Sequence, residues 1–266
     1  MDHTLIQALK TIIIKAGEMA LTIRSSGLIV EKKEDDSPVT NADLNISNFI
    51  YKNLNNLDKN IPIICEERLS KQTPTTDKFW LVDPIDGTKS YIKNMDSFTV
   101  NIALIQNNYP IIGLIYIPVL KKLYFTDHQG ALCIEQDGAK IENKTLPKLV
   151  SNQIQKSEDF IAVVSSNNFN SQTKDFISNH NFSKVVSIPS SIKLCMIAEN
   201  SCDVYPKFGQ TMEWDIAAGH ALINAVGGMV VDVSNNQVLS YNKANFTNPH
   251  FLAMNQRYCT EFFRLP

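Results

Sequence analysis

The segment Asp83-Pro84-Ile85-Asp86-Gly87-Thr88 combines the groups that a metal and phosphate site uses. Two carboxylates on one bend can share divalent cations, and glycine lets the backbone come close to an anion. The Thr88 hydroxyl can position a water molecule. The apolar run from Phe79 to Val82 predicts a strand that enters a core, and Pro84 predicts a turn there rather than a continuing central strand. An ordinary turn, in which each Asp caps its own loop, is the alternative.

Other acidic side chains stand at predicted element boundaries: Asp43 at a helix start, Glu66 and Glu67 at a strand end, and Asp215 at the start of a late helix. Carboxylates at neighbouring strand ends converge on one sheet edge, where cations must offset their repulsion. Each acid also has a structural interpretation. Asp43 could form a capping box with Thr40, Asp215 could be a helix N-cap, and the glutamates could simply be solvated.

Oxygen ligands without paired His or Cys predict Mg²⁺, two ions or more, with Mn²⁺ as a substitute, rather than zinc. Two such ions can activate a water on one side of a phosphoryl group and stabilise the departing oxygen on the other. The predicted chemistry is therefore metal-assisted hydrolysis of a phosphate ester. No P-loop or dinucleotide glycine fingerprint is present, so neither anhydride hydrolysis nor hydride transfer has a motif behind it.

The elements that must position these groups follow from periodicity. Apolar residues at helical spacing predict a helix from Leu5 to Ile23 that stops at Gly27, and a second from Ala42 to Leu57 after a charged turn, Glu31 to Ser37. Strand-like runs with short links then predict a meander: Ile61–Cys65, Phe79–Val82, Phe98–Ile105, Ile111–Ile117, Leu123–Thr126 and Ala131–Ile134.

Strands and helices alternate in the second half, over Ile161–Val164, a polar helix to about Asn179, Lys184–Ile188, Ile192–Glu199, Asp203–Tyr205, Asp215–Val226 and Met229–Val233. We therefore expect an α+β N-terminal half and an α/β C-terminal half. The polar stretch Glu142 to Asp159 marks the expected boundary, which gives a metal-binding sub-domain over 1–145 and a substrate-binding sub-domain over 146–266.

The composition excludes several classes of protein. The 266 residues are 44% hydrophobic and 20% charged with a formal charge of −2, which favours a globular protein and gives no footprint for nucleic acid. Five scattered cysteines without a CxxC pair favour a reducing compartment. We expect no secretory signal and no membrane span, because the longest apolar run, Ile111 to Leu120, is interrupted by glycine and proline.

Several long motifs in order carry a family resemblance: Lys33-Glu34-Asp35-Asp36-Ser37-Pro38-Val39-Thr40-Asn41-Ala42-Asp43, Glu66-Glu67, Asp83 to Lys89, Ser190-Ser191-Ile192-Lys193, and Tyr205 to Leu222. Together they resemble the magnesium-dependent, lithium-sensitive phosphatases related to inositol monophosphatase, and within them the bacterial CysQ-type 3'(2'),5'-bisphosphate nucleotidases. The resemblance runs from about residue 10 to the C-terminus and implies a layered αβαβα sugar-phosphatase-type fold.

The resemblance also implies residue roles. Glu66 and Asp83 would bind the first metal, and Asp83, Asp86 and Asp215 the second, with the Ile85 carbonyl as a further ligand. The Gly87 and Thr88 amides would hold the phosphate. Asp43 and Thr88 would orient and deprotonate the attacking water, unless Asp43 only holds the turn in place. Glu67 would contact the metal ligands without binding a metal itself.

On the substrate side, the resemblance implies that Lys89, Lys193 and Lys207 hold the second phosphate of a bisphosphorylated nucleotide, although exposed lysines are often only solvated. It also implies further substrate-binding residues: Ser191, and Glu66, Ile85, Asp86 and Asp215 beside the metals. Relatives have Arg at position 207 and commonly read Ser-Arg-x-His where this chain has Ser165-Ser166-Asn167-Asn168. This departure loses a cation and an imidazole, so the basis of adenosine recognition is left open.

The expected activity is hydrolysis of the 3'-phosphate of adenosine 3',5'-bisphosphate to AMP and phosphate. The alternatives are an inositol monophosphatase or broader sugar-phosphate phosphatase and, more remotely, a non-catalytic nucleotide or metal sensor. We expect a cytoplasmic protein, either monomer or homodimer. Peripheral association with the inner membrane's cytoplasmic face is left open because the resembling family includes such proteins. Cys195 and Cys202 are interpreted as packing residues, and His220 as a packing residue or one that supports the metal ligands, not as a general base.

Overall fold

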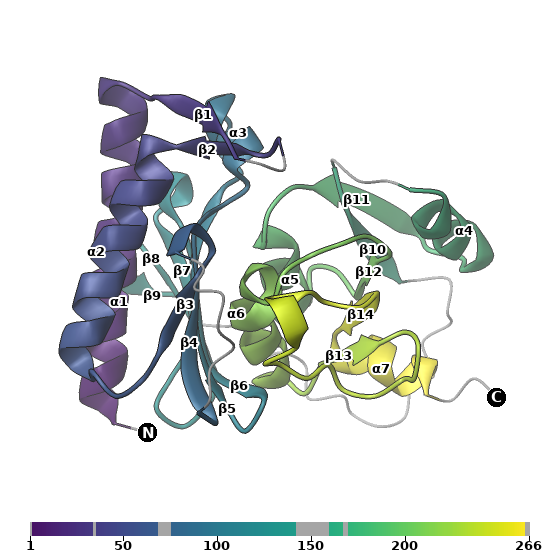
Figure 1. The fold of residues 1–266 in the computed structure, drawn as a ribbon. Coiled ribbons are helices and arrows are strands. Elements are labelled where there is room, and N and C mark those ends of the chain that lie inside the picture. Colours follow the sequence, from purple (N-terminus) through teal and green to yellow (C-terminus); the bar gives the residue numbers. More distant parts are fainter. Residues whose placement is uncertain (1, 34–35, 69–75, 142–159, 167–169, 264–266) are drawn as a thin grey trace.

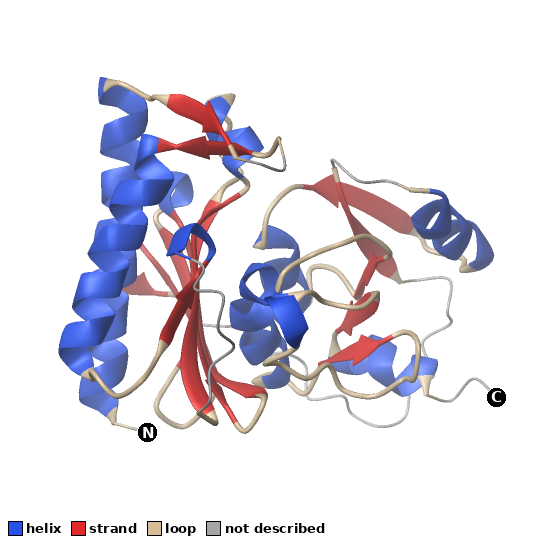
Figure 2. Cartoon of the chain, in the orientation of Figure 1, coloured by secondary structure: helices blue, strands red, loops and turns tan. Residues whose placement is uncertain are grey.

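The computed structural model describes residues 2–33, 36–68, 76–141, 160–166 and 170–263. In this part of the chain the elements form five layers, in the order helices, sheet, helices, sheet, helices (Figure 1). Figure 2 shows the two sheets on either side of the central helices. The layered αβαβα fold predicted from the sequence is thus confirmed.

The first layer is a pair of long helices, α1 (His3–Ser26) and α2 (Asn41–Leu57). Their apolar residues recur at helical spacing, so one face of each is buried against the first sheet. Gly27 ends α1 with a φ of 146°, as its position in the sequence predicted. The segment between the helices is a hairpin rather than only a charged turn, because β1 (Val30–Lys32) and β2 (Pro38–Thr40) pair antiparallel.

The first sheet has seven strands in the order β3-β4-β5-β6-β7-β8-β9 within the described residues, and only β3 and β4 are parallel. This is the predicted meander. Its strands are β3 (Ile63–Cys65), β4 (Lys78–Asp86), β5 (Thr99–Gln106), β6 (Tyr109–Ile117), β7 (Lys122–Thr126), β8 (Leu132–Gln136) and β9 (Ala139–Lys140), with the short helices η1 (Glu66–Arg68), α3 (Thr88–Ile92) and η2 (Pro118–Leu120) in the connections.

The prediction that the chain turns at Pro84 was wrong. β4 continues through Pro84 to Asp86 because β3 ends at Cys65, opposite Val82, so β4 has a partner only on its β5 side at the proline. The β4–β5 register also shifts between Asp83 and Asp86, which accommodates a residue that cannot donate to the ladder.

The second sheet has the order β11-β10-β12-β14-β13, and its members are β10 (Ile161–Ser165), β11 (Lys184–Ile188), β12 (Val204–Lys207), β13 (Met229–Asp232) and β14 (Phe251–Met254). Strands β10, β11 and β12 are parallel, as expected for an α/β half, whereas β14 runs antiparallel to both its neighbours. The α/β pattern therefore gives way to a mixed sheet.

Helices α5 (Ile192–Ala198) and α6 (Glu213–Asn224) lie between the two sheets, while α4 (Ser171–Asn179) and α7 (Gln256–Phe262) cover the outer face of the second, with η4 (Ala244–Phe246) in a connection (Figure 1). One continuous core joins both sheets through α5 and α6.

All strands of the first sheet precede residue 141, and all strands of the second follow residue 160. The division into sub-domains 1–145 and 146–266 stays a prediction, because its boundary lies in 142–159, outside the described residues. No described helix is both long enough and apolar enough to cross a membrane.

Candidate active site

The end of β4 carries the two aspartates of the opening motif into the interior. Asp83 is 1% exposed, and its Oδ1 accepts a hydrogen bond of 3.1 Å from the amide of Ile85. Asp86 accepts from the main-chain amide of Ser191 and lies 3.5 Å from the Thr99 hydroxyl, which donates to it. The two carboxylates are therefore fixed by neighbouring groups of the sheet and of the loop before α5.

Gly87 follows Asp86 in the left-handed region, with a φ of 93°, and starts α3. A Cβ atom there would lie 3.2 Å from the Ser97 carbonyl oxygen and 3.2 Å from Ser190 Cβ. Both the backbone conformation and the limited space favour glycine. The resemblance in sequence assigned the amide of this glycine to phosphate.

The two carboxylate oxygens of Asp43 accept hydrogen bonds from different parts of the chain. Oδ2 accepts from the Thr40 amide at 2.8 Å and completes a capping box at the start of α2. Oδ1 accepts from the Thr88 hydroxyl at 3.4 Å, while the same hydroxyl donates to the Ile85 carbonyl at 3.1 Å. Burial raises the pKa of Asp43. The capping box and the Asp43–Thr88 pairing thus coexist.

Glu66 and Glu67, in η1, are held by one cation. Lys33 Nζ lies 2.9 Å from Glu66 Oε1 and 2.6 Å from Glu67 Oε1. Burial raises the pKa of Glu67 to about 7, although the hydrogen bond from Lys33 opposes the change. Neither glutamate is simply solvated, and Lys33 ties the β1–β2 hairpin to this edge of the sheet.

Asp215 is the third residue of α6, not the N-cap that the sequence suggested. The helix begins at Glu213, so Asp215 reaches back and accepts from the Met212 amide at 2.8 Å. This is the acidic half of a capping box, and it points the carboxylate toward the start of the helix.

These carboxylates influence one another strongly. Burial raises the pKa of Asp83 well above its usual value, and the charges of Glu66, Asp86 and Asp215 raise it further. The pKa of Asp215 is raised by burial and then by Asp86 and Glu66. Acids drawn from α6, β4 and η1 therefore lie within one electrostatic neighbourhood, where a divalent cation would relieve their repulsion.

The donor set fits magnesium by its chemistry, because it is composed of carboxylate and carbonyl oxygens. Within the described ranges, no three acidic, histidine or cysteine side chains already converge on one point. The individual carboxylates instead contact protein donors: Asp86 the Ser191 amide, Asp215 the Met212 amide, and Glu66 the Lys33 ammonium. These contacts would have to loosen for the carboxylates to share an ion.

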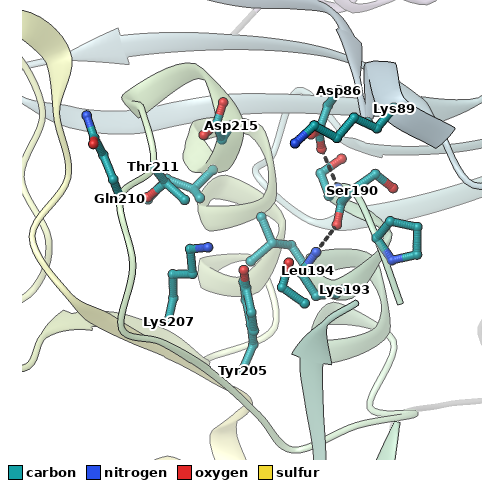
Figure 3. Close-up of a pocket in the computed structure, with 15 residues that line it drawn as sticks. Asp86, Lys89, Ser190, Lys193, Leu194, Tyr205, Lys207, Gln210, Thr211 and Asp215 are labelled. Carbon is teal, nitrogen blue, oxygen red and sulfur yellow. Dashed lines mark hydrogen bonds between the residues drawn. The ribbon is translucent and has the colours of Figure 1, made fainter. Parts of the chain in front are cut away.

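A pocket of 240 Å³ opens beside these acids (Figure 3). Of the predicted site residues, it is lined by Asp86, Gly87, Lys89, Ser191, Lys193, Lys207 and Asp215. The other six predicted site residues do not line it: Asp43, Glu66, Glu67, Asp83, Ile85 and Thr88.

Two of the lysines in the pocket are buried rather than solvated, each being 5% exposed. Burial lowers the pKa of Lys193 to about 8 against the attraction of Asp86, and its Nζ donates to the Ser190 carbonyl at 2.5 Å. Burial also lowers the pKa of Lys207, against the attraction of Asp215 and Asp86. Lys89, in contrast, is exposed at the rim.

Residues 1–261 match the inositol monophosphatase family. The chain belongs to this family. The 3'(2'),5'-bisphosphate nucleotidase CysQ of Salmonella typhimurium is 34% identical over 226 residues, which are 83% of this chain and 86% of that protein. The protein of the same name from Buchnera aphidicola is 37% identical over 203 residues, 76% and 73% of the respective chains.

Among solved structures, CysQ from Bacteroides thetaiotaomicron, a bacterial member of the inositol monophosphatase family, has 35% identity and a TM-score of 0.78, over 96% of this chain and 98% of its own. An IMPase from Thermotoga maritima has 20% identity and a TM-score of 0.76, over 99% and 96%, which shows the shared fold. The resemblance inferred from the motifs is therefore confirmed.

Several residues that line the pocket had no role predicted from the sequence: Ser165, Pro189, Ser190, Leu194, Tyr205, Gln210, Thr211 and Ile216. Tyr205 stands two residues before Lys207 on a strand, and this spacing predicts that both face the same way. Ser165 lies at the end of β10; Asn167 and Asn168, which follow it, lie outside the described residues.

The residues interpreted as packing groups are buried. His220 and Cys195 are 0% exposed, as is Cys202. His220 Nδ1 lies 2.9 Å from the Tyr241 hydroxyl, on the side of α6 away from the pocket lining.

Proposed function

We propose that this chain is a phosphoric monoester hydrolase that removes the 3'-phosphate of adenosine 3',5'-bisphosphate and yields AMP and phosphate. The supporting observation is the pairing of two features at one place. The carboxylates at the end of β4 and the start of α6 suit a metal-assisted attack, and the adjoining pocket offers buried lysines that suit a second anionic group. Relatives that share about a third of its residues carry the name 3'(2'),5'-bisphosphate nucleotidase.

Magnesium would be held by Glu66, Asp83, the Ile85 carbonyl, Asp86 and Asp215, as the family resemblance implies. When bound, it supplies electrostatic stabilisation of the phosphoryl group and makes the attacking water more acidic. Mn²⁺ has the same ligand preference and could substitute.

Asp43 and Thr88 are proposed to accept the proton of the attacking water. Since Oδ2 of Asp43 is engaged by Thr40, only Oδ1 faces the site, where it accepts from the Thr88 hydroxyl. This hydrogen bond orients Thr88 Oγ1 so that its lone pairs can accept a hydrogen bond from the water. As Thr88 takes the water's proton, its own hydroxyl proton passes to Asp43 Oδ1. The raised pKa of Asp43 makes this carboxylate a better proton acceptor than an exposed aspartate.

The remaining groups bind and orient. The amides of Gly87 and Thr88, at the start of α3, are proposed to hold the phosphate that is cleaved. Lys193 and Lys207 are proposed to bind the phosphate that is retained, with Lys89 at the rim. Ser191 contributes its main-chain amide to Asp86, while its hydroxyl is engaged by Thr99 at 2.7 Å and Asn101 at 2.9 Å. Glu67, through Lys33, supports Glu66.

A broader sugar-phosphate phosphatase is the second candidate, because Ser165 and Ser166 stand where relatives commonly carry serine and a cation. Phosphate release should be compared among adenosine 3',5'-bisphosphate, its sulfated form, inositol 1-phosphate and fructose 1,6-bisphosphate, each with magnesium. The proposal expects the two nucleotides to be the best substrates. A preference for inositol 1-phosphate would overturn the substrate assignment and leave the hydrolytic mechanism intact.

A further inference from the structure

Tyr205 is a buried residue in the pocket wall whose hydroxyl is uncommitted. Its side chain is 4% exposed, yet the hydroxyl makes no hydrogen bond within the described part of the chain. Figure 3 shows the side chains of Tyr205 and Lys207 side by side, with their polar ends toward the pocket. A buried phenol normally has a hydrogen-bond partner, so a hydroxyl that lacks one and faces a pocket points to a ligand.

Two neighbouring side chains hold the ring of Tyr205. The Lys193 ammonium lies 5.0 Å from its centroid, and Phe251 meets it edge-on at 5.7 Å. With the ring clamped, the hydroxyl has a defined direction before any ligand binds. Such preorganisation lowers the entropic cost of making a new hydrogen bond.

Two cations, Lys193 and Lys207, lie beside Tyr205. Lys207 follows on the same face of β12, and it makes no hydrogen bond or ion pair with the described residues. Lys193 feels the charge of Lys207, which lowers the pKa of Lys193 in addition to the effect of burial. Two buried ammonium groups so close together are stabilised by an anion placed between them.

We propose that the Tyr205 hydroxyl donates a hydrogen bond to the phosphate that the enzyme retains, and so acts as a specificity-determining residue beside Lys193 and Lys207. The inference rests on the proposed function. A phosphate offers several acceptor oxygens, enough for two ammonium groups and one hydroxyl. A ribose hydroxyl carries no charge and would not offset the repulsion between the two lysines.

The protonation state of Tyr205 agrees with a donor role. Burial raises the pKa of Tyr205, and the carboxylates of Asp86 and Asp215 raise it further. The phenol therefore stays neutral and keeps its proton next to an anion.

The substitution Tyr205→Phe tests the role, because it removes the hydroxyl and keeps the ring between Lys193 and Phe251. Kinetics should be measured with adenosine 3',5'-bisphosphate and with 3'-AMP, which lacks the retained phosphate. We expect KM for the bisphosphate to rise about ten- to a hundredfold with kcat nearly unchanged, the loss typical of a hydrogen bond to a charged group. The parameters for 3'-AMP should not change.

Tyr124→Phe is the matched control, because the Tyr124 hydroxyl is also buried but donates to Glu199 at 2.7 Å, away from the pocket. It should leave KM for both substrates unchanged. Calorimetric titration with 5'-AMP, which carries only the retained phosphate, gives a readout independent of turnover. Tyr205→Phe should weaken this binding about tenfold or more.

Equal losses on the bisphosphate and on 3'-AMP, or an unchanged affinity for 5'-AMP, would overturn the assignment of Tyr205 even if the bisphosphate is hydrolysed. A wild-type protein that binds 5'-AMP through Tyr205 but does not hydrolyse the bisphosphate would support the binding role and contradict the proposed function alone.

Discussion

The main-chain amide of Ser191 donates a hydrogen bond to the carboxylate of Asp86 and so connects the start of α5 to the end of β4. The contact joins the two halves of the chain at the site itself. A ligand of the proposed metal cluster is thereby positioned by the same segment that carries Lys193 into the pocket. The proposed metal site and the proposed substrate pocket thus share a single loop.

Asp86→Asn should remove turnover while the fold persists. The amide oxygen can still accept from Ser191, but it lacks the charge that a magnesium ligand needs. Because changes behind metal ligands already cost about ten- to a hundredfold, loss of a ligand should lower kcat by more than about a hundredfold. Phosphate release and the melting temperature would be measured together. Asp127→Asn, which changes an aspartate that caps an exposed loop, is the control. Unchanged turnover in Asp86→Asn would remove the two-metal proposal.

Lys207→Met should separate binding from stability. The substitution keeps an unbranched side chain and removes an ammonium whose pKa is lowered by burial, so the folded protein should melt at a higher temperature. KM for the bisphosphate should rise about tenfold or more, because a charge-assisted contact is lost.

Lys122→Met is the control for Lys207→Met, since Lys122 pairs with Glu199 at 3.0 Å outside the pocket. It should leave KM unchanged and confer no gain in stability. A Lys207→Met protein with normal KM would show that this lysine is not used for the substrate.

The sequence was most informative where a residue's type limits it to few roles. Helical spacing and Gly27 predicted α1 almost to its ends. The acidic motifs contain the carboxylates of Glu66, Asp83, Asp86 and Asp215, which influence one another in the structure. The backbone of the site also depends on which strands pair with one another. Whether Pro84 ends a strand depends on where β3 stops, which β4's own residues do not specify.

Other elements were not predicted because their local signals are weak. β14 is a run of four apolar residues without alternation, and it becomes a strand by pairing with both β12 and β13. Tyr205 belongs to a family motif, but the sequence predicted no role for it. Its burial and its free hydroxyl exist only once α5 and β12 are packed together.

His220 should make stability depend on pH. Burial lowers the pKa of His220 to about 3, whereas an unfolded histidine titrates near its ordinary value of 6.5. Below pH 6.5 the unfolded chain binds a proton at this histidine, whereas the folded protein binds it only near pH 3. Stability is therefore complete above pH 6.5 and is lost as the pH falls toward 3, by up to about 1.4 kcal/mol per pH unit.

Denaturant unfolding between pH 4 and pH 8 would measure this effect in the wild type, in His220→Gln and in His3→Gln, whose histidine is exposed. Only His220→Gln should flatten the difference in unfolding free energy between the two ends of the range. Equal slopes in all three proteins would show that His220 is not buried in its neutral form.

Gly113→Ala should disturb the contact between the first sheet and α6. An added Cβ would lie 2.2 Å from the Ala218 carbonyl oxygen and 2.8 Å from Ala221 Cβ, so the helix must move. The expected loss is about 1–3 kcal/mol of unfolding free energy. Activity should fall as well, because α6 carries Asp215. A fully stable and fully active variant would contradict the tight packing of β6 against α6.

The central claim is that the carboxylate cluster and the lysine pocket act on opposite ends of one bisphosphorylated nucleotide. The most direct measurement is to identify the products formed from adenosine 3',5'-bisphosphate with magnesium, by chromatography against 5'-AMP and 3'-AMP standards. The account predicts 5'-AMP and one equivalent of phosphate, with no turnover when the metal is chelated. Release of 3'-AMP, or no phosphate release while inositol 1-phosphate is hydrolysed, would contradict it.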